Sequence, residues 1–253
     1  WDTMDFPQKN AYTFDDLRRL VACLRAPDGC PWDREQTHGS IRRDFIEETY
    51  EAVEAIDRDD PALLCEELGD VLFQVAFHTR IEEERGRFTM EDVLTGIIRK
   101  MLIRHPHVFG ETEVSGTGEV LRNWESIKNA VKGVGSKTET LRLVPETFPA
   151  LMRADKLLKR ADQAGADGTA AVAASLPGAY EDFLAAGSGA EGEKALGKLL
   201  MAVTAAAREK GLDAEMSLLA ACKALTEDFA KAEEDSRETP ETLSEAFREA
   251  LGR

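Results

Sequence analysis

IEETYEAVEAIDRDDPALLCEELGDVLFQVAFHTR, residues 46–80, decides the fold of this chain and points to its chemistry. An α-helix turns by about 100° per residue, so Glu47, Glu48 and Glu51 share one face of a first helix. Glu67 lies one turn from Asp70 on a second helix, and the turn residues between the two segments let them pack antiparallel. The pattern therefore predicts a helical hairpin that gathers carboxylates at one place.

Such a gathering of acids is costly without compensation. Like charges repel, and burial in a low-dielectric environment disfavours the charged form of each carboxyl group. A hard divalent cation relieves both effects. Mg²⁺ or Mn²⁺ suits oxygen-only ligands, and Mg²⁺ is commonly held by a few carboxylates together with water and substrate phosphates. The stretch therefore predicts a metal centre.

The rest of the chain reads as helices joined by turns. Apolar spacing predicts helices over residues 14–24, 40–56, 61–85, 90–104 and 119–131, and again over 148–164, 170–186, 193–208, 214–232 and 240–251. No segment alternates long enough to predict a sheet, so the fold class is all-α. On the second helix of the hairpin, the apolar side includes Leu68, Leu72 and Ala76, and Gly69 indicates a close helix crossing.

Composition narrows the functional classes. Of 253 residues, 43% are hydrophobic, and 32 Lys and Arg stand against 48 Asp and Glu, a formal net charge of −16. This balance argues against nucleic acid and anionic membranes as partners. No apolar run approaches the roughly 20 residues that span a bilayer. The four cysteines form no CxxC pair, which favours reduced thiols in a cytoplasmic protein over disulfides or structural zinc.

Cations and aromatic residues follow the hairpin. Lys100 and Arg104 are four residues apart and are neighbours on one helix face. They form either a solvated basic stripe or a phosphate site that serves the acids. Trp124 and Lys128 have the same spacing on the next helix. Trp32 lies in GCPWDREQT, residues 29–37, which predicts an ordered loop, and its ring either plugs the end of the helical bundle or contacts a ligand.

The second half of the chain repeats the hairpin motif without its acids. Residues 67–72, ELGDVL, align with residues 195–200, ALGKLL, so Ala195 and Lys198 replace Glu67 and Asp70. With small offsets, Lys100, Arg104, Trp124 and Lys128 fall opposite Ala224, Asp228, Phe247 and Leu251. A shared apolar scaffold with a coordinated loss of polar groups supports interpretation of the first-half residues as one site.

Together these patterns resemble the MazG family of nucleoside triphosphate pyrophosphohydrolases. The resemblance rests on EExxE at residues 47–51, ExxD at 67–70, GCPWDREQT, RHPHVF at 104–109, and WxxxK at 124–128. It implies an all-α nucleoside triphosphate pyrophosphatase fold of tandem four-helix-bundle-type MazG domains. The expected boundaries are a catalytic domain at 11–132, a linker at 133–147, and a degenerate, structural or dimerising domain at 148–253.

The resemblance also implies roles for individual residues. Glu48, Glu51, Glu67 and Asp70 would hold Mg²⁺, with Glu47 as a further ligand, an outer carboxylate or the acceptor of the water's proton. Lys100 and Arg104 would hold phosphates, while Trp124, Lys128 and Trp32 would approach the nucleoside. The expected substrate is a nucleoside triphosphate, cleaved between its α and β phosphates to a monophosphate and pyrophosphate. The expected assembly is a homodimer.

Other interpretations are weaker. A nucleotide- or alarmone-binding regulator with decayed catalysis would not need every acid to be retained. A structural scaffold would leave the ordered set of motifs unexplained. A di-iron bundle lacks its Glu-x-x-His pairs in the acidic cluster. The sequence therefore favours a nucleotide house-cleaning enzyme.

Overall fold

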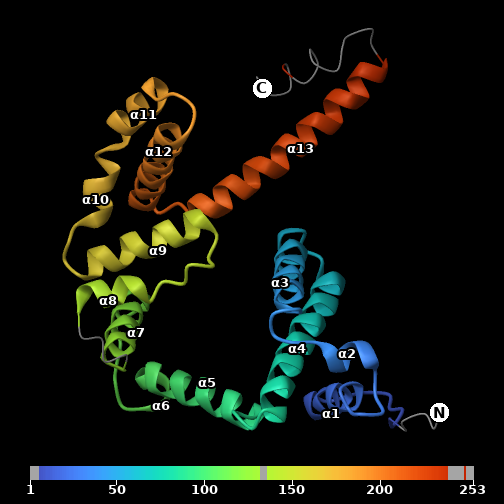
Figure 1. The fold of residues 1–253 in the computed structure, drawn as a ribbon. Coiled ribbons are helices and arrows are strands. Elements are labelled where there is room, and N and C mark those ends of the chain that lie inside the picture. Colours follow the sequence, from blue (N-terminus) through green and yellow to red (C-terminus); the bar gives the residue numbers. More distant parts are fainter. Residues whose placement is uncertain (1–5, 132–135, 239–247, 249–253) are drawn as a thin grey trace. The chain divides into compact units, whose positions relative to one another are not determined.

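The computed structural model describes residues 6–131, 136–238 and 248. The chain forms two compact units, Trp1–Lys128 and Asn129–Arg253 (Figure 1). The ordered elements within the described ranges are helices, with no strand among them. This confirms the all-α prediction. No helix in these ranges has the length and apolar character needed to cross a membrane.

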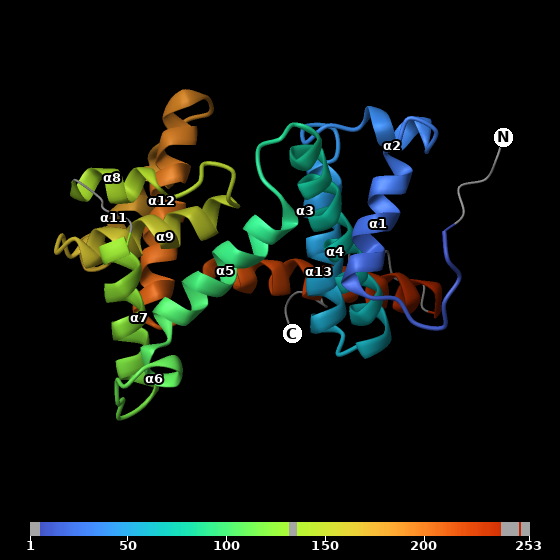
Figure 2. The ribbon, with the colours of Figure 1, turned by 90° about the horizontal axis from the view of Figure 1, so that it is seen from below.

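Three long helices make the centre of the first unit. The helices α1 (Phe14–Leu24) and α3 (Arg42–Asp57) both pack on α4 (Pro61–Glu84), and Figure 2 shows α4 between them. The unit also contains α2 (Pro31–Glu35), α5 (Met90–Arg104), α6 (Pro106–Phe109) and the start of α7 (Thr117–Val131). Its buried apolar cluster joins α1, α4 and the first residue of α5 through Val21, Ile41, Ala76, Phe77, Ile81 and Met90.

Local capping explains where these helices begin. Thr13 and Thr89 each form a capping box with the aspartate three residues later. Asp60 accepts hydrogen bonds from the backbone N–H groups of Ala62 and Leu63, and Pro61 occupies the first helical position. The α3–α4 hairpin is thus set by sequence signals at its turn.

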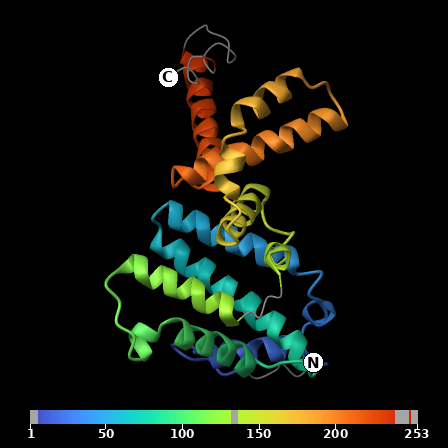
Figure 3. The same cartoon turned by 90° about the vertical axis from the view of Figure 1, so that its left-hand side faces the viewer.

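The second unit is built from shorter helices. It contains α8 (Lys137–Arg142), α9 (Ala150–Gln163), α10 (Gly168–Ala173), α11 (Leu176–Ala185), α12 (Ala190–Glu209) and α13 (Ala214–Glu238). Both α10 and α11 pack against α12, and Figure 3 shows α11 and α12 as an antiparallel hairpin in orange. The buried cluster of this unit contains Leu158, Ala173 and Ala205.

Several local predictions differ from the structure. The GCPWDREQT segment contains the short helix α2, because Pro31 occupies a first helical position that needs no N–H. The helix predicted over 170–186 is two helices, α10 and α11, and the break lies just before Pro177, which disfavours a continuous helix. Part of the predicted linker is α8. The helix predicted over 240–251 lies outside the described residues except for Arg248.

Two packing predictions on α4 are wrong. Leu68 and Leu72 are 50% and 47% exposed. A Cβ added at Gly69 would meet nothing within 4 Å, so no close helix crossing accounts for this glycine. From α5, Met90 is buried in the core cluster and Val93 packs against it.

Candidate active site

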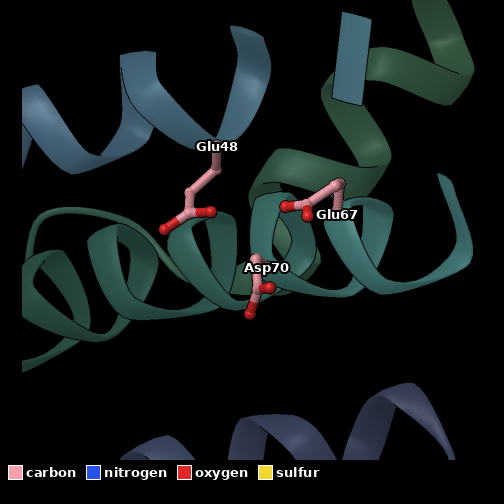
Figure 4. Close-up of side chains that lie close together, drawn as sticks. All are labelled: Glu48, Glu67 and Asp70. Carbon is pink, nitrogen blue, oxygen red and sulfur yellow. The ribbon is translucent and has the colours of Figure 1, made fainter. Parts of the chain in front are cut away.

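The predicted acids meet where α3 and α4 pack together. Glu48 extends from α3 toward Glu67 and Asp70 on α4, as Figure 4 shows. One carboxylate oxygen from each residue lies within 4.8 Å of the other two. Packing of α3 on α4 brings together residues about 20 positions apart in sequence, which the helix spacing had predicted.

Burial and mutual repulsion raise the pKa of two of these acids. Glu67 is 9% exposed, and loss of hydration followed by the negative charge of Glu51 raises the pKa of its carboxyl group. Glu48 is half-buried, and its pKa is raised first by burial and then by the charges of Asp70, Glu51 and Glu67. A side-chain hydrogen bond with Glu51 raises it further. Glu51 therefore belongs to this four-residue acidic cluster, consisting of Glu48, Glu51, Glu67 and Asp70.

The acidic cluster has no cation of its own. Within the part of the chain that the structure describes, no Lys, Arg or His forms an ion pair with any of the four carboxylates. Three carboxylates whose oxygens lie within 4.8 Å of one another, with a fourth hydrogen-bonded to Glu48, form the oxygen-only donor set that Mg²⁺ and Mn²⁺ prefer. The residues present thus fit a hard divalent cation, which would remove the repulsion that raises the pKa values.

Glu47 is oriented differently from the other acids of its motif. It is exposed, and its carboxylate accepts a hydrogen bond of 2.8 Å from Nε of Arg43, one turn earlier on α3. The structure therefore does not bring Glu47 together with the acidic cluster. The acids that converge are those one and four residues further along the helix.

The predicted phosphate and nucleoside residues form a second group, on α5 and α7. The Arg104 guanidinium lies 5.1 Å from the centre of the Trp124 ring, in a cation–π contact. His105 packs edge-on against the same ring at 4.9 Å, and its Nδ1 lies 2.7 Å from the carbonyl oxygen of Met101. Lys100 is exposed one turn before Arg104. The side chain of Lys128 lies outside the described residues.

Trp32 does not plug the bundle. Its side chain is 62% exposed, so that interpretation is wrong, and a ligand contact stays a prediction. The loop around it is held by Arg25, whose Nη1 donates to the carbonyl oxygens of Asp33 and Gln36 at 2.6 and 3.1 Å. Arg25 also pairs with Glu84 at 2.9 Å, which fixes this segment against α4.

The sequence interpretation missed a polar network between α4 and the segment that precedes α3. His38 stacks on His78 with Nδ1 atoms 2.7 Å apart, and its Nε2 lies 2.5 Å from Glu82. The His38 hydrogen bond and the charges of Arg87 and Arg85 lower the pKa of the buried Glu82 carboxyl group. The four-residue spacing of His78 and Glu82 on α4 was the available signal. Only the fold brings His38 to them.

The chain matches a known enzyme family. Residues 36–109, which include the whole acidic cluster, match the MazG nucleotide pyrophosphohydrolase domain. Over 223 residues the chain is 38% identical to the nucleoside triphosphate pyrophosphohydrolase/pyrophosphatase MazG of Thermotoga maritima, an alignment that covers 87% of this chain and 86% of the relative. The chain therefore belongs to the MazG nucleotide pyrophosphohydrolase family and is a hydrolase acting on acid anhydrides.

Two further relatives show how far the similarity extends. The nucleoside triphosphate pyrophosphohydrolase of Escherichia coli strain K12 is 38% identical over 213 residues, 81% of each chain. The protein YabN of Bacillus subtilis is 49% identical over 148 residues, which are 58% of this chain and 30% of YabN. The similarity thus covers most of this chain in two relatives and a shorter region in the third.

Proposed function

We propose that this protein is a Mg²⁺-dependent nucleoside triphosphate pyrophosphohydrolase. It would cleave a ribo- or deoxyribonucleoside triphosphate between the α and β phosphates and release a monophosphate and pyrophosphate, as a nucleotide house-cleaning enzyme. The observation that carries the proposal is the acidic cluster, which lies inside the region that matches the family. Glu48, Glu67 and Asp70 converge, Glu51 is hydrogen-bonded to Glu48, and among the described residues no Lys, Arg or His forms an ion pair with them. The T. maritima and E. coli relatives carry names of this activity.

The roles of the residues follow from their placement. Glu48, Glu51, Glu67 and Asp70 would hold Mg²⁺, or Mn²⁺ in its place, between α3 and α4. The bound ion would neutralise phosphate charge and lower the pKa of a coordinated water. Glu67 is the most buried of these four acids and Asp70 is exposed, so a nucleotide would approach from the side of Asp70. Glu47 is exposed and paired with Arg43, so we assign it a smaller part in the reaction than the four metal ligands, limited to accepting a proton.

Phosphate binding would fall to the second group. Arg104 is held on Trp124 by its cation–π contact, so the guanidinium is oriented before a phosphate arrives. Among the described side chains, no ion pair joins Lys100 or Arg104 to the acidic cluster. We infer that a second copy of the chain completes the site, and we propose a homodimer as the working form.

The apolar surface of α5 supports this assembly. Leu94, Ile97, Ile98 and Leu102 share one helix face and are all exposed. On the helical wheel, Arg104 lies at the edge of this face, and Lys100 lies about 60° beyond that edge. Contiguous exposed apolar surfaces often mark interaction sites. A partner that covered this face would lie beside Arg104. We also expect the protein in the cytoplasm, where its four free cysteines would stay reduced.

The test is hydrolysis of a nucleotide panel with detection of pyrophosphate. Purified protein with Mg²⁺ should convert at least one nucleoside triphosphate, and Glu67→Gln and Asp70→Asn should each lower kcat by about 100-fold or more, because each removes a charged ligand. Glu54→Gln is the matched control, since Glu54 is an exposed acid on α3 that pairs with Arg58. Nucleotide binding without turnover in the wild type would instead support a regulator.

A further inference from the structure

The second unit contains a cavity that the family's chemistry does not use. Its volume is about 820 Å³, and it lies among α10, α11 and α12. Small-molecule sites commonly measure about 300–1,000 Å³. The lining that matters for recognition consists of Ser175, Gly178, Asp182, Lys194, Lys198 and Met201. The size and the mixture of apolar and charged groups suit a small organic anion.

The cavity's charges are unpaired and mainly positive. Lys194 and Lys198 are four residues apart on α12, so their side chains leave the same face of the helix. Asp182 is the acid on the α11 side. Within the described ranges, none of these three side chains forms an ion pair or a hydrogen bond. Two neighbouring ammonium groups repel each other, and an anion bound between them would relieve that repulsion.

One of these lysines, Lys198, takes the position of an acid of the first unit's cluster. The sequence alignment sets Lys198 opposite Asp70 and Ala195 opposite Glu67, which also places Lys194 opposite Glu66. In both units the aligned segment lies on the second helix of a packed hairpin, α3–α4 or α11–α12. The carboxylates of the first hairpin can bind a phosphate only through a cation. The lysine ammonium groups of the second hairpin can bind a phosphate directly.

The remaining lining fits a nucleoside. Gly178 and Gly197 have no side chains to fill the space, and Val172 and Met201 add apolar surface for a base. The carboxylate of Asp182 can accept hydrogen bonds from ribose hydroxyl groups. With one acid, the cavity lacks the oxygen-rich donor set that Mg²⁺ requires. We propose that this cavity binds a nucleoside diphosphate without metal and without hydrolysing it.

Binding to the 253-residue protein in EDTA tests the proposal. Isothermal titration with ADP and GDP should detect a metal-independent site, and Lys194→Ala/Lys198→Ala should weaken it at least tenfold. Lys223→Ala is the matched control, because Lys223 is an exposed lysine on α13 that does not line the cavity. Both target lysines are exposed, so the double variant should keep its helical circular dichroism.

Two results would overturn the proposal. One is no binding of either diphosphate at millimolar concentration in EDTA. The other is a lack of phosphate recognition by the lysines. It would be seen as equal ADP affinity in the wild type and the double-lysine variant, or as equal affinity of the wild type for adenosine and ADP. Because EDTA silences the acidic cluster, failure here would leave the proposed hydrolase activity untouched. Loss of hydrolysis in Glu67→Gln would in turn leave this binding unchanged.

Discussion

At the residue scale, Glu67 combines burial with like-charge neighbours, and both effects raise the pKa of its carboxyl group. A folded-state pKa above the unfolded value means that the charged carboxylate destabilises the fold. This penalty is present above the raised pKa and disappears as the pH falls through it. Natural sites retain such costs where binding requires them. The metal-free acidic cluster should therefore be a source of instability near neutral pH.

We therefore expect Glu67→Gln to raise the melting temperature of the metal-free protein at pH 7. The gain should shrink as the pH falls and the wild-type carboxyl group becomes protonated. Thermal unfolding in EDTA at several pH values measures this. Mg²⁺ should raise the melting temperature of the wild type more than that of the variant. A variant less stable than the wild type at pH 7 would contradict this account.

The acids of the cluster could be predicted because helix spacing alone places them on facing surfaces. The network of His38, His78 and Glu82 could not, because His38 precedes α3 and meets α4 only once the loop after α2 is folded. Glu47 shows the converse limit. Its place in the EExxE motif suggested a site residue, while the nearby Arg43 gives its carboxylate another partner.

At the element scale, two glycines in the first unit differ in the space available for a side chain. A Cβ at Gly29 would collide with the backbone carbonyl oxygens of Cys23 and Leu24, where the chain turns after α1. At Gly69, inside α4, a Cβ would meet nothing within 4 Å. Apolar spacing predicted both ends of α4 closely, but propensity could not reveal which glycine has a steric reason. That depends on neighbours brought in by packing.

The substitution pair Gly29→Ala and Gly69→Ala tests this contrast. Gly29→Ala should destabilise the fold by about 1–3 kcal/mol, because backbone atoms must move to admit the methyl group. Gly69→Ala should stabilise it by about 0.5–1 kcal/mol, because alanine is the better helix former and the space is free. Urea unfolding of both variants beside the wild type gives the two free energies. Destabilisation by Gly69→Ala would mean that another chain approaches α4 there.

At the scale of the whole molecule, sequence periodicity gave helices in the right places but not which apolar faces stay uncovered. The apolar spacing of residues 90–104 predicts a helix but does not show whether its apolar face is covered. In the structure Leu94, Ile97, Ile98 and Leu102 are exposed, and so are Leu68 and Leu72 on α4. Whether a helix packs within its own chain or on a partner is decided by the connection after α4, which periodicity does not encode.

Ile98→Asp should therefore separate the proposed dimer. Ile98 is 55% exposed in the middle of the apolar face of α5, so an aspartate there costs the single chain little but would bury an unpaired charge in an interface. Light scattering coupled to gel filtration should give twice the 27.9 kDa of one chain for the wild type and one chain for the variant. Leu184→Asp, at a 64% exposed leucine of the second unit, is the control and should stay dimeric.

The activity of the Ile98→Asp variant tests whether the dimer completes the site. If a second copy supplies Lys100 and Arg104 to the phosphates, loss of the dimer should lower the rate of hydrolysis by about tenfold or more. A fully active Ile98→Asp monomer would show that one chain completes its own site.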